Sequence, residues 1–522
     1  MDVCTNVIAY GNVMLQILTR ESARSMRALH SIKKRSNVVF PALFRIGLAT
    51  IFLLTALAAV SCSSGGQTPD LNRLYSFEGR AVSQPPVIVI PGILGSRLRN
   101  HATGEEVWPG SAWNLLFDRK EHLALKFDPN TLEPLDDGIE AAGLFERAFG
   151  HDFYGEILRT LEESGGYTRG TSGQKVSGAG RRYYVFAYDW RQDNVVTARK
   201  LDAFIEQVRR DYGNPKLKVD IIAHSMGGLI ARYYINYGTR DVLDGNDFPI
   251  NLSGAEKLHT VILLGTPNLG SADSLHSFLL GPKVGLRRIP PEVLATMPST
   301  YELFPHPLNN WLVTPAGTTL DRDLFDVEIW QRFEWSVFSP EVIQRMRARF
   351  GVAADADQYV HAIQRYFEKR LDRARRFVWS LTVKPPATPV KLVVFGGDCT
   401  PTPARVVVEE DGGDSVVRLF PDEIRHKQPG VDYERLMLEP GDGEVTKPSL
   451  LARENLNPLE PRDMNISFPL AAAFFLCEEH SMLTGNISFQ DNLLNVLLSQ
   501  ERPWDAPARK LKQSMRHSES HK

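Results

Sequence analysis

Cysteine is scarce in this chain. The 522 residues include four, which are Cys4, Cys62, Cys399 and Cys477. They are too few for a disulfide scaffold and too scattered for a zinc site, so we expect no bound metal. An excess of charge of one sign is also lacking, because the formal net charge is −2. No global field therefore attracts the chain to nucleic acid, and we expect no nucleic-acid partner.

The N-terminal region lacks an apolar run of comfortable membrane-spanning length. Its apolar segment, Ile46 to Val60, follows a basic flank and ends in small residues, which is the pattern of a secretory signal. The end, Ala59-Val60-Ser61-Cys62, resembles a bacterial lipobox, in which the cysteine is lipidated and becomes the mature N-terminus. We expect an exported lipoprotein, anchored to a membrane through Cys62 and facing the periplasm or the cell exterior. The alternative is a plain signal cleaved near Ala59.

Composition divides the chain into consecutive segments. The extension before Met26 is unusually long for a signal, so residues 1–25 are a candidate artefact of gene prediction. The small and polar residues after Cys62 suit a flexible tether. The expected segments are a signal (1–61), a tether (62–80), a core in two parts (81–267 and 390–500) separated by a cap insertion (268–389), and a basic tail (501–522).

The most informative stretch runs from Lys218 to Tyr234. The apolar run Val219 to Ala223 predicts a buried strand, and the apolar spacing after Ser225 predicts a helix. Small residues, Ala223 and Gly227, lie two positions on either side of the serine. A nucleophile elbow needs such neighbours, because its strained turn leaves no room for larger side chains. The competing interpretation is a serine in an ordinary tight turn.

Strands and helices alternate around this turn. Strands are expected at Val87–Ile90, Arg181–Ala187, Val219–Ala223 and His259–Leu264, with helical patterns between them, and later at Val390–Phe395 and Leu470–Leu476. This order predicts an α/β fold with a mostly parallel, doubly wound sheet. The strand rhythm stops between 268 and 389, where helical patterns predict a cap over the active site.

The first strand ends in Pro91-Gly92, well before the elbow. In the α/β-hydrolase fold this position supplies an oxyanion donor, and the backbone N–H of Ile93 is the candidate. The N–H of Met226, directly after the serine, would be the second. The alternative is a turn that merely ends a strand.

A serine nucleophile needs a histidine base that a carboxylate orients. His480 is the histidine between the last expected strand and the tail, which fits the chain order serine, acid, histidine. Asp398 follows an expected strand, and Asp442 lies in a glycine-flanked turn nearer to His480. Pattern reasoning alone leaves the choice of acid open.

Several segments together resemble the lecithin:cholesterol acyltransferase family. The matching stretches are Ile90-Pro91-Gly92-Ile93-Leu94-Gly95, Tyr188-Asp189-Trp190-Arg191, Ala223-His224-Ser225-Met226-Gly227, Leu264-Gly265-Thr266-Pro267, Pro401-Thr402-Pro403, Gly441-Asp442-Gly443 and His480. The resemblance implies an α/β-hydrolase with a helical cap, and it assigns the acid to Asp442. Glu444 departs from the family's usual threonine. Cys399 and Cys477 follow strands expected to be adjacent, so they are candidates for pairing in an oxidising periplasm.

The leading hypothesis is a serine acyl hydrolase or O-acyltransferase that acts on lipid esters through an acyl-enzyme and needs no cofactor. Its partners are a lipid ester, an alcohol or water as acceptor, and a membrane surface. An apolar cluster around Trp113 is either an insertion that touches lipid or a satellite core. The alternatives are an esterase for small or protein-linked esters and a non-catalytic surface lipoprotein. The residues do not separate hydrolysis from acyl transfer.

Overall fold

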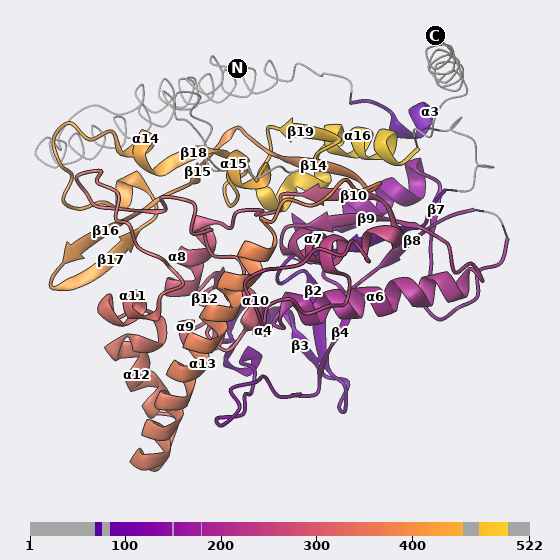
Figure 1. Cartoon of the computed structure of the whole chain (residues 1–522). Coiled ribbons are helices and arrows are strands. Elements are labelled where there is room, and N and C mark those ends of the chain that lie inside the picture. The colour runs from indigo at the N-terminus through magenta and orange to yellow at the C-terminus, as the bar shows by residue number, and fades with distance from the viewer. Residues whose placement is uncertain (1–67, 76–83, 149–150, 179, 453–468, 499–522) are drawn as a thin grey trace, which may run out of the picture. The chain divides into compact units, whose positions relative to one another are not determined.

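A seven-stranded parallel sheet forms the centre of the computed structural model (Figure 1). The structure describes residues 68–75, 84–148, 151–178, 180–452 and 469–498, so the expected signal, Cys62 and the basic tail lie outside the described residues. The strand order is β19-β14-β10-β9-β1-β8-β7, and every neighbouring pair is parallel. The strands are β1 (Val87–Ile90), β7 (Tyr167–Arg169), β8 (Arg181–Val185), β9 (Val219–His224), β10 (Leu258–Leu264), β14 (Lys391–Gly397) and β19 (Ala472–Leu476).

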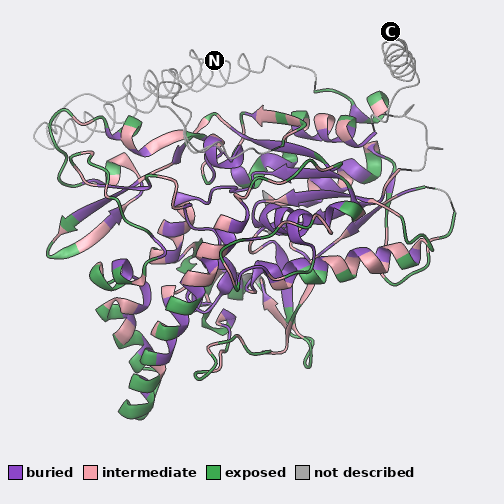
Figure 2. Ribbon diagram, in the orientation of Figure 1, coloured by how far each residue is buried: buried purple, intermediate pink, exposed green. Residues whose placement is uncertain are grey.

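Each face of this sheet carries its own hydrophobic core. Side chains alternate along a strand, so Ile88 and Ile90 pack with residues of α6 (Asn194–Asp211) and α7 (Met226–Tyr237). Val87 and Val89 point the other way and pack with residues of α16 (Ile487–Leu498). Burial on both faces explains why the central strands are mostly apolar, and Figure 2 shows them in the buried colour. The expected doubly wound α/β-hydrolase fold is confirmed.

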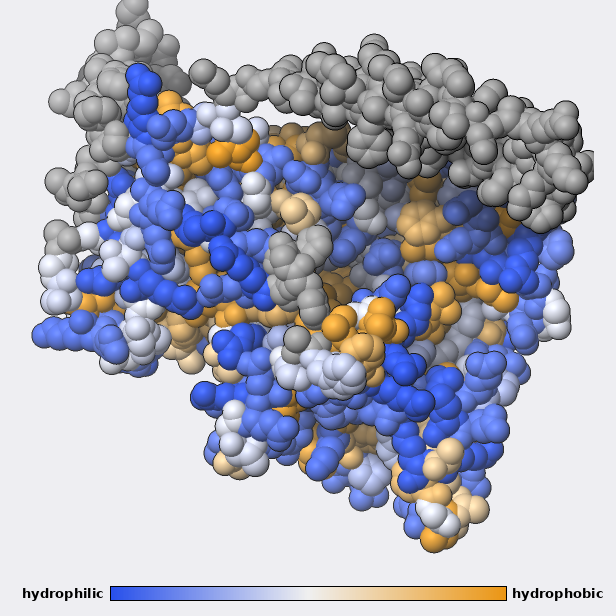
Figure 3. Space-filling model, turned by 180° about the vertical axis from the view of Figure 1, so that it is seen from behind, coloured by the Kyte–Doolittle hydropathy of each residue, from blue (hydrophilic) through white to orange (hydrophobic). Residues whose placement is uncertain are grey.

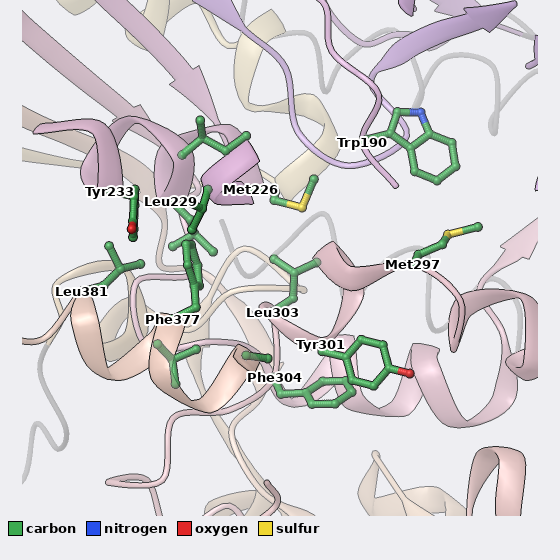
Figure 4. Close-up of a cluster of buried hydrophobic side chains, with 14 of the residues drawn as sticks. Trp190, Met226, Leu229, Tyr233, Met297, Tyr301, Leu303, Phe304, Phe377 and Leu381 are labelled. Carbon is green, nitrogen blue, oxygen red and sulfur yellow. The ribbon is translucent and has the colours of Figure 1, made fainter. Parts of the chain in front are cut away.

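Segment 268–389 is mainly helical and adds no strand to the central sheet. Its helices are α8 (Ala272–Leu280), α9 (Pro291–Leu294), α10 (Pro298–Tyr301), α11 (Val327–Arg332), η5 (Ser336–Phe338), α12 (Pro340–Arg347) and α13 (Ala353–Ser380). Figure 4 shows side chains of α7 and of this segment gathered in one buried cluster. Within it, the rings of Tyr233 and Phe377 stack with centroids 5.7 Å apart. The segment therefore shares the core of the sheet domain.

Smaller sheets lie outside the central one. β16 (Val406–Asp411) and β17 (Asp414–Arg418) form a hairpin, and β16 also pairs with β13 (Leu312–Val313). The other short strands are β2 (Ser96–Asn100), β3 (Glu106–Trp108), β4 (Ile139–Leu144), β5 (Arg147–Ala148), β6 (His151–Asp152), β11 (Lys283–Val284), β12 (Arg287–Arg288), β15 (Thr400–Pro403) and β18 (Leu438–Gly441).

The remaining helices are short. They are α3 (Leu71–Tyr75), α4 (Ala112–Phe117), η2 (Glu121–Leu123), α5 (Gly155–Arg159), η3 (Thr160–Ser164), η4 (Ala255–Lys257), η6 (Pro421–Glu423), α14 (Tyr433–Met437), α15 (Lys447–Leu450) and η7 (His480–Gly485). In the ranges that the structure covers, no helix is both long and apolar enough for a bilayer crossing.

Candidate active site

Ser225 occupies a sharp turn between β9 and α7. Its backbone has φ 53° and ψ −125°, a region that non-glycine residues seldom adopt. The Ser225 N–H donates to the carbonyl of Leu264 at 2.8 Å, which holds the turn against β10. A Cβ on Gly227 would lie 2.5 Å from the carbonyl oxygen of Pro91. A small residue is therefore required there, as the sequence pattern predicted for an elbow.

Asp442 and His480 form a buried pair beside this turn. Asp442 Oδ2 lies 2.8 Å from His480 Nδ1, and the two residues are 2 % and 5 % exposed. Asp442 Oδ1 accepts the N–H groups of Glu444 and Val445, at 3.1 and 2.7 Å. The His480 N–H donates to the carbonyl of Asp442 at 2.8 Å, so backbone and side chain fix the pair together.

The other candidate acid has a different partner. Asp398 Oδ2 lies 2.8 Å from the Lys447 ammonium, so its carboxylate forms a surface ion pair. Between the two candidates, the structure brings Asp442 to the histidine. A disulfide between Cys399 and Cys477 joins the ends of β14 and β19, three residues before His480. The pairing that the adjacent strands suggested is thus present.

Ser225 and His480 line one cavity of about 490 Å³. No hydrogen bond joins their side chains in the described part of the chain. Most of the lining is apolar, from Ile93, Leu94, Trp108, Leu115, Phe145, Phe153, Phe278, Leu294 and Leu303. The charged lining residues besides His480 are Asp273, Lys283 and Glu444. The reacting groups thus face a space suited to an apolar ligand.

Carboxylates dominate the electrostatics around His480. Burial lowers the pKa of His480, but the charges of Asp442 and Glu444, the Asp442 hydrogen bond and Asp273 outweigh it and raise the pKa to about 9. Glu444 Oε2 lies 3.6 Å from His480 Nε2, on the side of the ring away from Asp442. Burial and the charge of Glu444 raise the pKa of Asp273 to about 7.

Both expected oxyanion donors are available. Met226 is the first residue of α7, so its N–H has no acceptor within the helix. Ile93 lines the cavity, and its N–H makes no hydrogen bond to the described residues. Losing one such donor typically costs on the order of 10²–10³ in rate.

Two residues of the site escaped the sequence analysis. Tyr154 Oη lies 2.8 Å from His224 Nδ1 and accepts the N–H of Gly92 at 2.9 Å. Burial, followed by the charge of His480, lowers the pKa of His224 to about 3, so this histidine is neutral. His224 stood inside the elbow motif, but nothing in the sequence marked Tyr154. Tyr154 immediately precedes α5, which begins at Gly155.

Among the residues that the structure describes, no three His, Cys, Asp or Glu side chains are grouped so that they could hold a metal ion.

Fold and site together define a lipase-type α/β-hydrolase, and comparison with known proteins narrows the class. The model of the family "Lecithin:cholesterol acyltransferase" matches residues 146–453. That is more than half of the chain, which therefore belongs to this family and is an enzyme of lipase or acyltransferase type. The matched range contains Ser225 and Asp442 and ends before His480. A search of curated proteins found no match.

One solved structure supports the fold, and two others show a weaker similarity. The Tle4–Tli4 complex is similar with a TM-score of 0.50 at 16 % identity, covering 79 % of this chain and 98 % of that chain. The mature lipase BlEst2 from Bacillus licheniformis gives a TM-score of 0.30 at 11 % identity, covering 81 % and 95 %. EstA from Clostridium botulinum gives 0.30 at 15 % identity, covering 81 % and 89 %.

Proposed function

We propose that this protein is a serine acyl hydrolase or O-acyltransferase that cleaves lipid esters through an acyl-enzyme. The observation that carries the proposal is the buried Asp442–His480 pair, whose histidine lines the same apolar cavity as the strained Ser225. An apolar cavity favours an acyl chain, because burying apolar surface stabilises by roughly 25 cal/mol per Å².

Each residue has a defined role in this mechanism. The Ser225 hydroxyl attacks the ester carbonyl while His480 Nε2 accepts its proton. Asp442 holds the imidazole in the required tautomer and stabilises the imidazolium. The N–H groups of Ile93 and Met226 donate to the oxyanion. His480 then protonates the leaving alcohol, and water or an acceptor alcohol releases the acyl group from Ser225.

A lipid substrate also fits the surface beside the cavity. Trp113 on α4 is 70 % exposed, and Leu286, between β11 and β12, is 63 % exposed. The two segments adjoin, since the Leu286 N–H donates to the Leu116 carbonyl at 2.9 Å. Leu115 and Gly285 of the same segments line the cavity. Figure 3, a view from behind, shows hydrophobic side chains exposed among hydrophilic ones.

The test begins with a fluorophosphonate probe, which should label the wild type and not Ser225→Ala. The purified protein is then incubated with mixed phospholipid vesicles, with and without an alcohol, and the products are identified by mass. Released fatty acid indicates hydrolysis, and a new ester indicates transfer. A soluble-ester enzyme would instead show no gain from C4 to C16 acyl chains or from micelles, and a non-catalytic lipoprotein would take up no probe.

We further propose that Cys62 carries the lipid of an exported, membrane-anchored lipoprotein. The support is the lipobox-like sequence that ends in Cys62 after an apolar segment. Metabolic labelling with an alkyne fatty acid should mark the wild type and not Cys62→Ala. Equal labelling of both would contradict the anchor and leave the enzymatic proposal standing.

A further inference from the structure

The loop from Pro91 to Ser96 is held by side chains from outside it. Trp108 Nε1 donates to the Leu94 carbonyl at 2.9 Å, and Trp190 Nε1 donates to the Ser96 carbonyl at 3.1 Å. Leu94 has φ 60°, a left-handed conformation that a leucine adopts only when its surroundings impose it.

Two tyrosine hydroxyls form hydrogen bonds with a single peptide group in this loop. Tyr188 Oη donates to the Pro91 carbonyl at 2.9 Å, and Tyr154 Oη accepts the Gly92 N–H at 2.9 Å. Both tyrosines are buried, at 2 % and 4 % exposed, and a Cβ on Gly95 would lie 2.9 Å from Tyr154 Oη. The peptide between Pro91 and Gly92 is thus fixed at its oxygen and at its nitrogen.

The next peptide group carries the Ile93 N–H. Its carbonyl, on Gly92, accepts the Gly95 N–H at 3.1 Å. In a trans peptide the N–H points opposite to the C=O, so this bond sets the direction of the Ile93 N–H. With the preceding peptide held by the two tyrosines, Ile93 offers an N–H without a partner in the described structure, at a residue that lines the cavity.

His224 determines which way the Tyr154 hydroxyl points. The Gly92 N–H can only donate, so the tyrosine oxygen accepts there and its own proton goes elsewhere. The nearby acceptor is His224 Nδ1, at 2.8 Å, which must therefore lack a proton. The arrangement requires a neutral His224, and the lowered pKa of this residue agrees with that requirement.

We infer that Tyr154 is a positioning residue for acyl transfer: its hydroxyl, oriented by His224, holds the Gly92 amide so that the neighbouring Ile93 N–H is presented to the oxyanion. Tyr188, from the Tyr-Asp-Trp-Arg motif, holds the other end of the same peptide. The inference rests on the proposed function, because it assigns a role in the same reaction. Among the described residues, no hydrogen bond joins either tyrosine side chain to Ser225 or His480.

The test compares three tyrosine-to-phenylalanine variants on a soluble butyrate ester. Tyr154→Phe should lower kcat about 10- to 100-fold with KM within about twofold, less than the loss of a whole oxyanion donor. Tyr188→Phe should act in the same direction. The matched control is Tyr237→Phe in α7. It removes a buried tyrosine hydroxyl that donates to the Ser380 carbonyl at 2.8 Å. Its kcat should stay within about twofold of wild type.

Inhibitor binding distinguishes positioning from general destabilisation. A boronic acid that forms a tetrahedral adduct with Ser225 should lose affinity in Tyr154→Phe by the same factor as kcat/KM. The double variant Tyr154→Phe/Tyr188→Phe should lose less than the product of the single losses, because both hydroxyls hold one peptide. His224→Asn, which places an amide oxygen near the Nδ1 position, should retain more activity than His224→Leu.

Several results would overturn the inference. Each of the following would do so: an unchanged kcat in Tyr154→Phe, a change in KM alone in that variant, and an equal fall of kcat in Tyr237→Phe. A wild type that neither reacts with a fluorophosphonate nor cleaves any ester would instead refute the proposed function, and the positioning role with it.

Discussion

The two walls of the cavity are built on different principles. One wall is the rim of the sheet, where Ser225, Asp442 and His480 are held by directed hydrogen bonds between 2.7 and 3.2 Å. The other wall, which includes Phe278 and Leu303, is held by hydrophobic packing. Hydrogen bonds fix individual atoms, whereas packing fixes a volume. We therefore expect changes in the first wall to alter the rate of the reaction, and changes in the second to alter which acyl chain enters.

The largest effect should come from the buried acid. Asp442→Asn keeps an oxygen for the N–H groups of Glu444 and Val445 but cannot stabilise the imidazolium, so kcat should fall by about 10³–10⁴. Asp398→Asn removes a partly exposed ion pair and should stay within about threefold of wild type. Steady-state kinetics on one ester measures both. A greater loss in Asp398→Asn would reverse the assignment of the acid.

The disulfide should matter next. Replacing Cys399 and Cys477 by serine should lower the free energy of unfolding by about 2–4 kcal/mol, because the bond closes a long loop. Urea unfolding with and without a reductant measures this difference, and the double variant should show no response to the reductant. Since the bond lies near His480, kcat should fall while the preferred chain length stays the same. A changed chain-length preference with an unchanged kcat would contradict the expectation that the first wall controls the rate and the second wall controls the choice of acyl chain.

A change in the apolar wall should act on selectivity. Leu303 lines the cavity, so Leu303→Trp fills part of it and should lower kcat/KM for a C16 ester about tenfold relative to a C4 ester. Leu303→Met, which nearly conserves the volume, should keep the wild-type ratio. Thermal unfolding of each variant shows whether the fold is intact. Equal losses on both esters would show that this wall also controls the chemistry.

The smallest effect should appear in the pH profile. His480 must be unprotonated to act as a base, so its raised pKa places the acidic limb of kcat/KM towards pH 9. Glu444→Thr removes a negative charge that raises this pKa, so the limb should move to lower pH and activity at pH 7 should rise a few-fold. High salt should reduce the pH difference between wild type and Glu444→Thr, because Glu444 is half-exposed and salt screens its charge. Glu256→Gln, at an exposed carboxylate in η4, should leave the profile unchanged.

The sequence predicts best those elements whose pattern is local. The central strands β1, β9, β10 and β14 were predicted because burial on both faces makes them predominantly apolar. The edge strand β7 was not, since it has three residues and two of them are exposed. The pairing of β13 with β16 joins residues about 90 positions apart through a two-residue strand, which leaves no periodic signal.

In the site, too, the sequence predicts local patterns better than contacts between distant residues. The elbow around Ser225 is a local pattern, and His480 follows from chain order. The choice between Asp442 and Asp398 depended on tertiary placement, because each follows a strand end. Tyr154 could not be predicted, since its hydrogen bonds reach residues 62 and 70 positions away.

The turn from Gly441 to Val445 carries two carboxylates that face opposite nitrogens of one imidazole. Asp442 orients the imidazole ring of His480, and Glu444 helps to set the pKa of that ring. Because different side chains encode these two properties, a single codon change at position 444 gives evolution a way to retune the enzyme to a more acidic or more alkaline habitat while its stereochemistry stays intact.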